Sequence, residues 1–554
     1  MFAGRFNDIS FKGDIFGGVT TAIISLPLAL AFGVASGAGA EAGLWGAILV
    51  GLFAALFGGS TSLISEPTGP MTVIMTAVLT SMMAKYPESG MAMGFTVVMM
   101  AGAFQILIGT LKLGKYVTLM PYSVVSGFMS GIGVILIILQ LSPLLGQAAP
   151  PGGVLGTISA LPNILTNINF SELLLGILTL AVLFFFPKHY RKYVPAQLVA
   201  LVAITLLSVI FFDTDSIRRI GEIPAGLPSI VIPHFNADMF MTMIVDALVL
   251  GTLGCIDTLL TAVIGDSLTR TEHDSDKELR GQGLANMISG LFGALPGAGA
   301  TMGTVTNIQV GARSPLSGIV RALVLALVVL MAGGLTEPIP MAVLAGIAVY
   351  VGFNILDWSF IQRAHKVSLQ GMMIMYGVML LTVFVDLIVA VGLGVFISNI
   401  IIIEQLSREQ ARQVKAISDN DQDVVPLTDS ERVLLDRANG KVLFFYLSGP
   451  MIFSVSKAIS RQHSSVGDYQ AMILDLTDVP MFDVTVGLAL ENAIKDAQEA
   501  NCAVLILCPN KQTRQQLAKF DLLDMVPKEN IYDFRHEALL ASLTYVESIS
   551  NDER

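Results

Sequence analysis

The sequence contains few charged residues, few cysteines and few histidines for a chain of 554 residues. Only 14% of the residues are charged, against about 25% in a typical soluble protein, and 53% are hydrophobic. Three cysteines are too few for a disulfide framework, and the six scattered histidines show no zinc-ligand spacing. The net charge of −11 argues against a nucleic-acid-binding protein, because no long basic patch is present to displace phosphate counterions. Most of this chain therefore needs lipid around it.

The charged residues are unevenly distributed. Residues 1–400 hold 37 of them, about 9%, whereas residues 401–554 hold 38, about 25%. The first part has the composition of a membrane domain and the last part that of a soluble domain. We predict a membrane domain over 1–404, a linker over 405–438 and a soluble domain over 439–554. The N-terminus lacks a signal-peptide pattern, so the first apolar segment is expected to be retained.

Apolar stretches close to bilayer-spanning length recur in the membrane domain, and we predict twelve to fourteen spans, with fourteen preferred. With the N-terminus inside, the inner segments carry fourteen Lys and Arg residues and the outer segments only three, Lys85, Arg218 and Arg219. This positive-inside bias places both termini and the soluble domain in the cytoplasm. The inner residues are Arg5, Lys12, Lys112, Lys115, Lys188, Arg191, Lys192, Arg270, Lys277, Arg280, Arg313, Arg321, Arg363 and Lys366.

Interrupted segments repeat along the chain. The segment around Pro27 precedes the Pro-rich break at Thr68 by 41 residues, and the segment around Asp257 precedes the Gly-rich break at Thr301 by 44. The half-to-half offsets are 230 and 233 residues. Seven spans per half is an odd number, so the two halves must have opposite orientations. Interrupted helices at matching places in inverted repeats indicate a transporter's substrate site. The alternative is that these breaks are ordinary kinks.

A predicted helix start follows each break. Pro67 and Pro70 suit a helix that begins near Thr68, since proline is tolerated in the first turn. A second helix is predicted to begin near Thr301. The N-terminus of each helix leaves N–H groups unpaired and carries a partial positive charge. Two such ends facing each other predict an anion site without a basic side chain, with the two threonine hydroxyl groups as further donors. Each threonine could instead bond to its own helix.

Asp257 is the most informative single residue. It lies in an apolar segment with no basic residue within ten positions, and Thr261 lies one turn later on the same face. An ionisable side chain in such a segment marks a functional site. The two side chains with exposed carbonyl groups suit sodium; Asp257 could instead carry a proton or form a purely structural hydrogen bond between helices. Because a carboxylate repels a nearby anion, a mobile cation at this place favours cation–anion symport over an anion leak.

Other charged residues are interpreted more simply. Glu66 precedes a helix start and is expected to be a local cap or an inward-facing charge. Asp14 and the charged run over 266–280 are expected to be solvated at the cytoplasmic surface.

The soluble part alternates short apolar runs with amphipathic stretches, which predicts an α/β fold. No catalytic constellation is present there, because the histidines are isolated and Cys502 and Cys508 lie near opposite ends of one strand. An appended enzyme such as a zinc carbonic anhydrase is therefore not expected. Thr485 is either a regulatory phosphoacceptor or, more simply, the cap of a helix start. The predicted strands are 442–447, 471–476 and 503–507, and the predicted helices lie near 453–463, 486–498, 511–519 and 537–546.

Several long blocks of the sequence resemble the sulfate permease (SulP) family of anion transporters, and most closely its BicA-type branch of sodium-dependent bicarbonate transporters. The resemblance covers nearly the whole chain, including a C-terminal STAS domain. Two departures from the wider family point to this branch: Pro27-Leu28 stands where many members have Pro-Gln, and Gly303 stands where many have arginine. Further similar blocks are Gly13–Gly18, Leu26–Ala47, Ile64–Val73, Leu253–Asp257, Asp266–His273 and Gly297–Val305.

The resemblance implies a polytopic α-helical membrane protein with 14 spans as 7+7 inverted repeats, in which a core subdomain moves against a gate subdomain, followed by a cytoplasmic α/β STAS domain. It implies a homodimer in the bacterial inner membrane, no cofactor, and sodium as a co-substrate. It places bicarbonate at the two helix starts and sodium beside them. The implied anion-binding residues are Thr68, Gly69, Ala300, Thr301 and Met302, and the implied sodium-binding residues are Asp257, Thr261, Gly299 and Ala300.

The predicted function is alternating-access symport of sodium and bicarbonate, not enzymatic catalysis. One alternative is proton-coupled or exchange transport of another anion, such as sulfate, a dicarboxylate or chloride. The other is an anion sensor that does not transport and signals through its STAS domain, where a cytoplasmic regulator could bind. Paired breaks and an intramembrane aspartate favour transport, because a sensor needs no alternating-access repeat.

Overall fold

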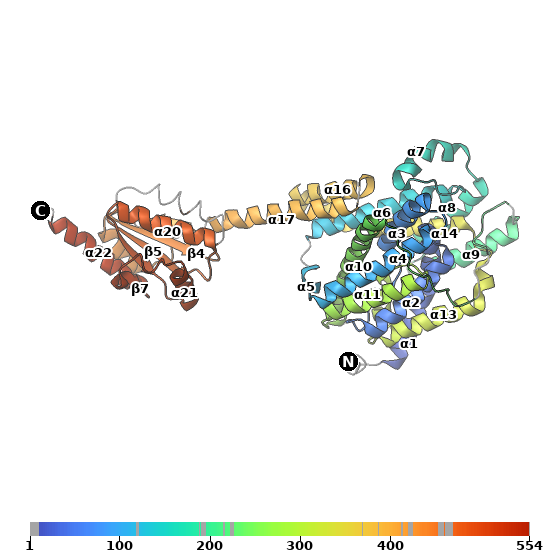
Figure 1. Cartoon of the computed structure of the whole chain (residues 1–554), viewed down its shortest axis with the longest axis horizontal. Coiled ribbons are helices and arrows are strands. Elements are labelled where there is room, and N and C mark those ends of the chain that lie inside the picture. The colour runs from blue at the N-terminus through green and yellow to red at the C-terminus, as the bar shows by residue number, and fades with distance from the viewer. Residues whose placement is uncertain are drawn as a thin grey trace. The chain divides into compact units, whose positions relative to one another are not determined.

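The computed structural model describes residues 10–117, 121–187, 189, 195–213, 216–221, 226–367, 369–385, 387–411, 414–418, 425–451, 459 and 469–552 (Figure 1). The chain divides into two compact units, Met1–Ser398 and Asn399–Arg554.

The first unit is almost entirely helical. Within the described ranges, six helices are long and apolar enough to cross a membrane, or seven if the bent pair α7 and α8 forms one span, and four further apolar helices are shorter. The helices are α1 (Phe11–Ser36), α2 (Ala40–Phe57), α3 (Gly69–Lys85), α4 (Gly90–Thr110), α5 (Gly114–Val117), α6 (Tyr122–Leu144), α7 (Gly153–Thr166), α8 (Phe170–Phe185), α9 (Ala196–Phe211), α10 (Phe240–Thr269), α11 (Ser275–Leu291), α12 (Thr301–Gln309), α13 (Leu316–Thr336), α14 (Met341–Ile355), α15 (Trp358–Val367), α16 (Leu369–Phe384) and α17 (Leu387–Ala411).

These helices form two bundles. In the first, which we call the core bundle, α11 packs on α4 and α2, α10 packs on α4, and α13 packs on α1 and α2. In the second, the gate bundle, α14 and α16 pack on α6, and α8 packs on α14 and α9. Contacts of α1 with α9 and α14, and of α3 with α6, join the two bundles. Each bundle therefore combines helices from both halves of the sequence.

Two short strands lie inside the core bundle. Strand β1 (Ser65–Glu66) pairs with β2 (Ala298–Gly299) in antiparallel register, with Ser65 opposite Gly299. Each strand leads into a half-helix, β1 into α3 and β2 into α12. The antiparallel pairing means that the two halves run in opposite directions here, as an inverted repeat requires. Helix α12 has only 9 residues, because this segment consists of strand β2 followed by a short helix. A count of long helices therefore does not include it, and the number of fourteen spans stays a prediction.

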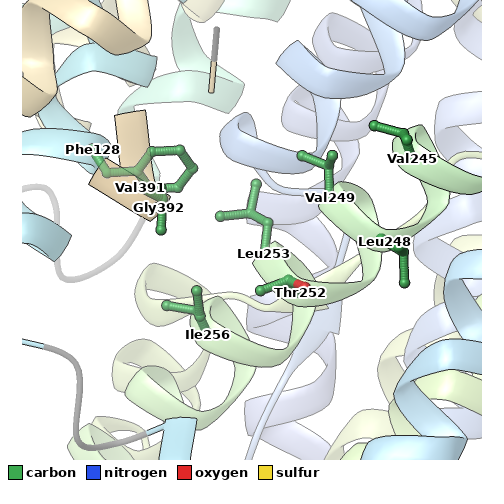
Figure 2. Close-up of a pocket in the computed structure, with 9 residues that line it drawn as sticks. All are labelled: Phe128, Val245, Leu248, Val249, Thr252, Leu253, Ile256, Val391 and Gly392. Atoms are coloured by element: carbon green, nitrogen blue, oxygen red, sulfur yellow. The ribbon is translucent and has the colours of Figure 1, made fainter. Parts of the chain in front are cut away.

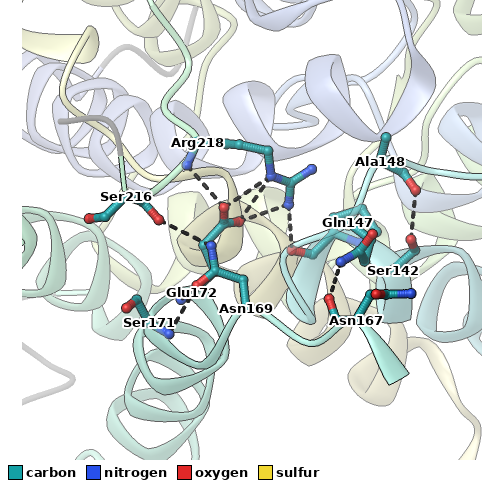
Figure 3. Close-up of polar contacts among 10 residues, drawn as sticks. Ser142, Gln147, Ala148, Asn167, Asn169, Ser171, Glu172, Ser216 and Arg218 are labelled. Carbon is teal, nitrogen blue, oxygen red and sulfur yellow. Dashed lines mark hydrogen bonds and ion pairs between the residues drawn. The ribbon is translucent and has the colours of Figure 1, made fainter. Parts of the chain in front are cut away.

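An ion pair between a buried carboxylate and a partly exposed arginine organises one end of the gate bundle (Figure 3). The Arg218 guanidinium donates from Nη2 to Glu172 Oε2 at 2.8 Å and from Nε to Oε1 at 3.0 Å, and its Nη2 also donates to the Pro143 carbonyl oxygen at 3.2 Å. The Glu172 side chain is 1% exposed. Asn169 caps α8 by accepting from the backbone N–H groups of Ser171 and Glu172. This cluster fixes the start of α8 against the end of α6.

Two of the charged residues that we expected to be solvated are instead buried and hydrogen-bonded, whereas Arg270, Glu272, Asp274 and Arg280 are exposed as expected. Asp14 is fully buried and accepts from the backbone N–H groups of Arg313 and Ser314, at 2.8 and 2.9 Å. Glu278 is 1% exposed and accepts from Gly59 N and Ser60 N at 2.6 and 2.7 Å. The prediction of a solvated surface was wrong for these two carboxylates, because loop N–H groups that lack a backbone acceptor recruit them.

The second unit is an α/β sandwich. Its sheet has the order β3-β4-β5-β6-β7, with β3 antiparallel to β4 and the other pairs parallel. Side chains of α20 and α21 pack on one face and those of α18 and α22 on the other, because alternate residues of β4 and β5 point to opposite sides. The elements are β3 (Val414–Ile417), α18 (Asp429–Arg437), β4 (Val442–Ser448), β5 (Ala471–Asp478), α20 (Val484–Glu499), β6 (Ala503–Leu507), α21 (Lys511–Lys519), β7 (Ile531–Tyr532) and α22 (Arg535–Asp552).

The three predicted strands and the three later helices of this unit are confirmed. The predicted helix near 453–463 lies outside the described residues, apart from Ile459. Thr485 is exposed in the first turn of α20, and the cap is Asp483, whose side chain accepts from Val486 N at 2.9 Å. The expectation that Thr485 is the cap was therefore wrong.

Cys508 provides a test of packing in this unit. Its side chain is fully buried after β6, and burial raises the pKa of its thiol to about 11, so the thiol is almost entirely neutral near physiological pH. At pH 8 only roughly 1 in 1,000 molecules carries the reactive thiolate, about 100-fold fewer than for an ordinary cysteine. We expect Cys508, as the only cysteine left in a Cys255→Ala/Cys502→Ala chain, to resist maleimide in the folded protein and to react in urea, as measured by mass spectrometry. Rapid labelling of the folded chain would contradict this packing.

Candidate functional site

The two half-helices begin without side-chain caps. Thr68 is the N-cap residue of α3 and Ala300 that of α12, and neither makes a side-chain capping hydrogen bond. The first N–H groups of a helix have no partner within it, so both ends present donors and partial positive charge. In α3 these donors are on Gly69 and Met71, since Pro70 has no N–H. In α12 they are on Thr301 and the two residues after it.

Amide side chains of α11 hold the strand that leads into α12. Asn286 Nδ2 donates to the Gly297 carbonyl oxygen at 3.0 Å, and Gly297 N donates back to Asn286 Oδ1 at 2.8 Å. Gln282 Nε2 donates to the same carbonyl at 2.9 Å. Ala300 N donates to the Ile64 carbonyl oxygen at 2.8 Å. These bonds fix β2 against β1 and so set the position of both helix starts.

Asp257 of α10 reaches this junction. Its Oδ2 accepts from the Thr68 hydroxyl at 2.8 Å, and the residue is 7% exposed. Thr261, one turn later, is fully buried and donates to the Gly299 carbonyl oxygen at 2.9 Å; its hydroxyl also lies 2.9 Å from the Thr301 hydroxyl. A carboxylate, three hydroxyls and a backbone carbonyl from three segments therefore converge. All are oxygen ligands, the type that a hard cation takes.

A cavity of about 540 Å³ opens beside these groups, between the core and gate bundles. Seven of the predicted site residues line it, and the eighth, Thr261, lies directly behind Gly299 and Thr301. Thr485 belongs to the second unit and has no part in this site. The gate side contributes Met129, Val351, Asn354 and Ile355, and the core side contributes Leu28, Phe32, Glu66, Pro67, Thr68, Gly69, Pro70, Asp257, Gly299, Ala300, Thr301, Met302, Val305 and Thr306.

A neighbouring cavity of about 470 Å³ shares Met302 and Thr306 with the first. Its lining includes the polar side chains of Thr20, Gln197 and Gln309. The two cavities therefore adjoin each other at α12, and polar side chains continue from the site along this helix at Thr306 and Gln309.

Another cavity, of about 400 Å³, has the opposite character (Figure 2). It lies between α10, α6 and α17, and among the described residues that line it Thr252 supplies the only polar side chain. An anion there would lose its hydration without gaining partners, which is costly. This apolar cavity is therefore excluded as the anion site. Its other lining residues are Phe128, Val245, Leu248, Val249, Leu253, Ile256, Val391 and Gly392.

A functional side chain that sequence reasoning placed wrongly is Arg321. We assigned it to an inner segment, but it is fully buried within α13 and its Nη2 lies 2.6 Å from Glu66 Oε2. The positive-inside count therefore falls to thirteen inner residues, of which Arg5, Lys188, Arg191 and Lys192 lie outside the described ranges. Of the two alternatives for Glu66, the structure favours the inward-facing charge over the cap, because Glu66 is buried in an ion pair with Arg321. The available signal was an arginine inside an apolar stretch, since such a residue needs a partner.

Comparisons with known proteins agree with this architecture. A model described as "Sulfate permease family" matches residues 11–378, and one described as "STAS domain" matches residues 435–538. The chain is 58% identical over 536 residues to "Bicarbonate transporter BicA" of Synechocystis sp., covering 96% of this chain and 95% of that protein.

Solved structures are also similar. The structure titled "The transmembrane domain of a cyanobacterium bicarbonate transporter BicA" has a TM-score of 0.66 at 61% identity and covers 70% of this chain and 98% of that one. "The overall structure of SLC26A9" has a TM-score of 0.81 at 16% identity and covers 98% of this chain and 91% of that one, a likeness of fold. The predicted fold class, a polytopic helical membrane domain with a C-terminal STAS domain, is confirmed.

Proposed function

The chain belongs to the sulfate permease family, and from this premise we propose that it is a secondary active transporter that carries bicarbonate into the cell together with sodium. Members of this family are transporters, so the chain is a transporter and not an enzyme. The relative named as a bicarbonate transporter matches nearly the whole chain, which supports bicarbonate over sulfate as the anion.

The single observation that carries the proposal is the position of Asp257 beside the start of α3, in the cavity that both helix starts line. Its hydrogen bond to Thr68 brings a carboxylate to the end of α3 that we assign to the anion. An anion gains from the two helix ends but is repelled by Asp257, and a sodium ion at Asp257 and Thr261 removes that repulsion. Sodium and anion therefore favour each other's binding, which is the thermodynamic basis of coupling.

The remaining assignments belong to the same proposal. Bicarbonate binds at Thr68, Gly69, Ala300, Thr301 and Met302, and sodium binds at Asp257, Thr261, Gly299 and Ala300. The core bundle moves against the gate bundle in a homodimer in the bacterial inner membrane, with both termini in the cytoplasm. We keep a membrane domain over 1–404 and a soluble domain over 439–554. We treat β3 and α18, which lie in the segment 405–438, as additions to the soluble sheet and not as a free linker. The exposed Thr485 of the STAS domain is a place where a cytoplasmic regulator acts.

Uptake of labelled bicarbonate into proteoliposomes, with and without an inward sodium gradient at fixed pH, tests this function. We expect sodium to stimulate accumulation on the order of tenfold or more. Uptake driven by a proton gradient and indifferent to sodium would favour the proton-coupled alternative. Anion binding without any transport would favour the sensor.

A further inference from the structure

Arg321 is a fully buried arginine close to the site, and each of its three guanidinium nitrogens donates a hydrogen bond. Nε donates to the Ser25 hydroxyl at 2.9 Å, Nη1 to the Ser65 carbonyl oxygen at 3.0 Å and Nη2 to Glu66 Oε2 at 2.6 Å. Ser65 and Glu66 are the two residues of β1, so Arg321 holds the strand that pairs with β2. These hydrogen bonds explain how Arg321 stabilises β1. They do not explain why the two positions carry a charged pair, because apolar residues can often replace a buried ion pair without loss of stability.

Glu66 stands between this arginine and the cavity. It lines the cavity beside Thr68, while its Oε2 is bound to Arg321. Its other oxygen faces the first turn of α12, because a Cβ built on Gly303 would lie 3.3 Å from Glu66 Oε1. The Glu66 carboxylate therefore lies directly between the guanidinium and the helix start that we assign to the anion.

The net charge of the cavity lining follows from three residues. Among the described residues that line the cavity, Asp257 and Glu66 are the ionisable ones, and Arg321 cancels Glu66. One uncompensated negative charge is left, on Asp257. Without Glu66, the charge of Arg321 would act on the anion through a short path of low dielectric, where a single charge has a large effect.

We propose that Glu66 masks Arg321, and that this masking makes anion binding depend on sodium. The inference rests on the proposed function. Glu66 and Arg321 are positioning residues that set the local charge, and neither is assigned as a ligand. Removal of the mask lets Arg321 supply the positive charge that sodium otherwise supplies, whereas removal of Arg321 adds a negative charge that more sodium must offset.

The test uses the full-length chain in proteoliposomes and measures the concentration of bicarbonate that gives half-maximal uptake, with and without sodium. We expect Glu66→Gln to raise the apparent bicarbonate affinity in the absence of sodium at least tenfold, and so to reduce the effect of sodium. Arg321→Met is expected to need at least tenfold more sodium than the double variant Glu66→Gln/Arg321→Met. That double variant, which carries neither charge, should retain a sodium dependence close to that of the wild type.

Glu172→Gln is the matched control, because it removes a buried carboxylate that pairs with a partly exposed arginine, Arg218, in the gate bundle and is not part of the cavity. It is expected to lower stability and to leave sodium dependence unchanged. A folded Glu66→Gln protein with wild-type sodium dependence would overturn the inference. So would equal sodium requirements in Arg321→Met and the double variant, a comparison that holds even if Glu66→Gln does not fold. Wild-type uptake that ignores sodium would instead contradict the proposed function itself.

Discussion

Replacement of Asp257 by asparagine is expected to abolish sodium-stimulated bicarbonate uptake, with a fall on the order of 100-fold. Asparagine has nearly the same volume and its carbonyl oxygen can still accept from the Thr68 hydroxyl, so the packing of α10 against α3 is retained. The negative charge that attracts sodium is lost, and a neutral amide oxygen is a far weaker ligand for a hard cation. Initial uptake rates against sodium concentration in proteoliposomes, together with thermal unfolding of the purified chain, measure the two parts of this prediction.

Asp238→Asn is a suitable control for this variant. Asp238 lies just before α10, is exposed, and pairs with the Tyr86 hydroxyl at 3.3 Å. The Asp238→Asn variant therefore loses the same charge as Asp257→Asn, but from a segment next to α10 that does not contact the site. Its uptake should remain within about twofold of the wild type, as for most surface substitutions. If Asp257→Asn folds and keeps its sodium response, Asp257 has no part in coupling.

The second large effect is expected from Gly297→Ala. A Cβ at Gly297 would lie 2.6 Å from the Glu66 carbonyl oxygen and 2.7 Å from its carbon, both backbone atoms. The two strands must therefore separate, which moves the starts of α3 and α12 apart and weakens the Asn286 clamp. We expect apparent affinities for both sodium and bicarbonate to fall by about tenfold or more, because displacements of about 1 Å at a preorganised site have effects of this size or greater.

Gly377→Ala is the matched control for that substitution. Gly377 lies in α16, and a Cβ built there meets nothing within 4 Å. Alanine is also the better helix former, so this variant should be at least as stable as the wild type and transport normally. Unchanged affinities in Gly297→Ala would mean that the strand pair does not set the geometry of the site.

The helix starts and Asp257 could be predicted from the sequence because each has a local signal. Proline and glycine mark a broken helix, and a lone carboxylate in an apolar stretch is conspicuous. The contact between Thr68 and Asp257 has no such signal, since the two residues are 189 positions apart and only the fold brings them together. An arginine in an apolar stretch indicated that Arg321 needs a partner, but the identity of that partner, Glu66, had no local signal because the two residues are 255 positions apart.

Two predictions that were based on polar composition were partly wrong. Asp14 and the charged run over 266–280 were expected to be solvated at the cytoplasmic surface, yet Asp14 and Glu278 bind loop N–H groups that the helical bundle leaves without a backbone acceptor. In the segment expected to be the linker, Val414–Ile417 forms an edge strand on β4, because a short run of alternating residues becomes a strand only when a neighbour supplies its hydrogen bonds.

The strand pair β1–β2 has a consequence for how the protein is made. Ser65 emerges from the ribosome long before its partner Gly299, and until then the backbone groups of β1 have no strand to bond with. Chains are synthesised at about 5–20 residues per second, so β1 waits for at least ten seconds or so at the faster end of that range. The first half cannot build the binding site by itself during this interval. The sites for the ion and the substrate therefore form late in biogenesis, when β2 of the newly made second half pairs with β1 of the first half.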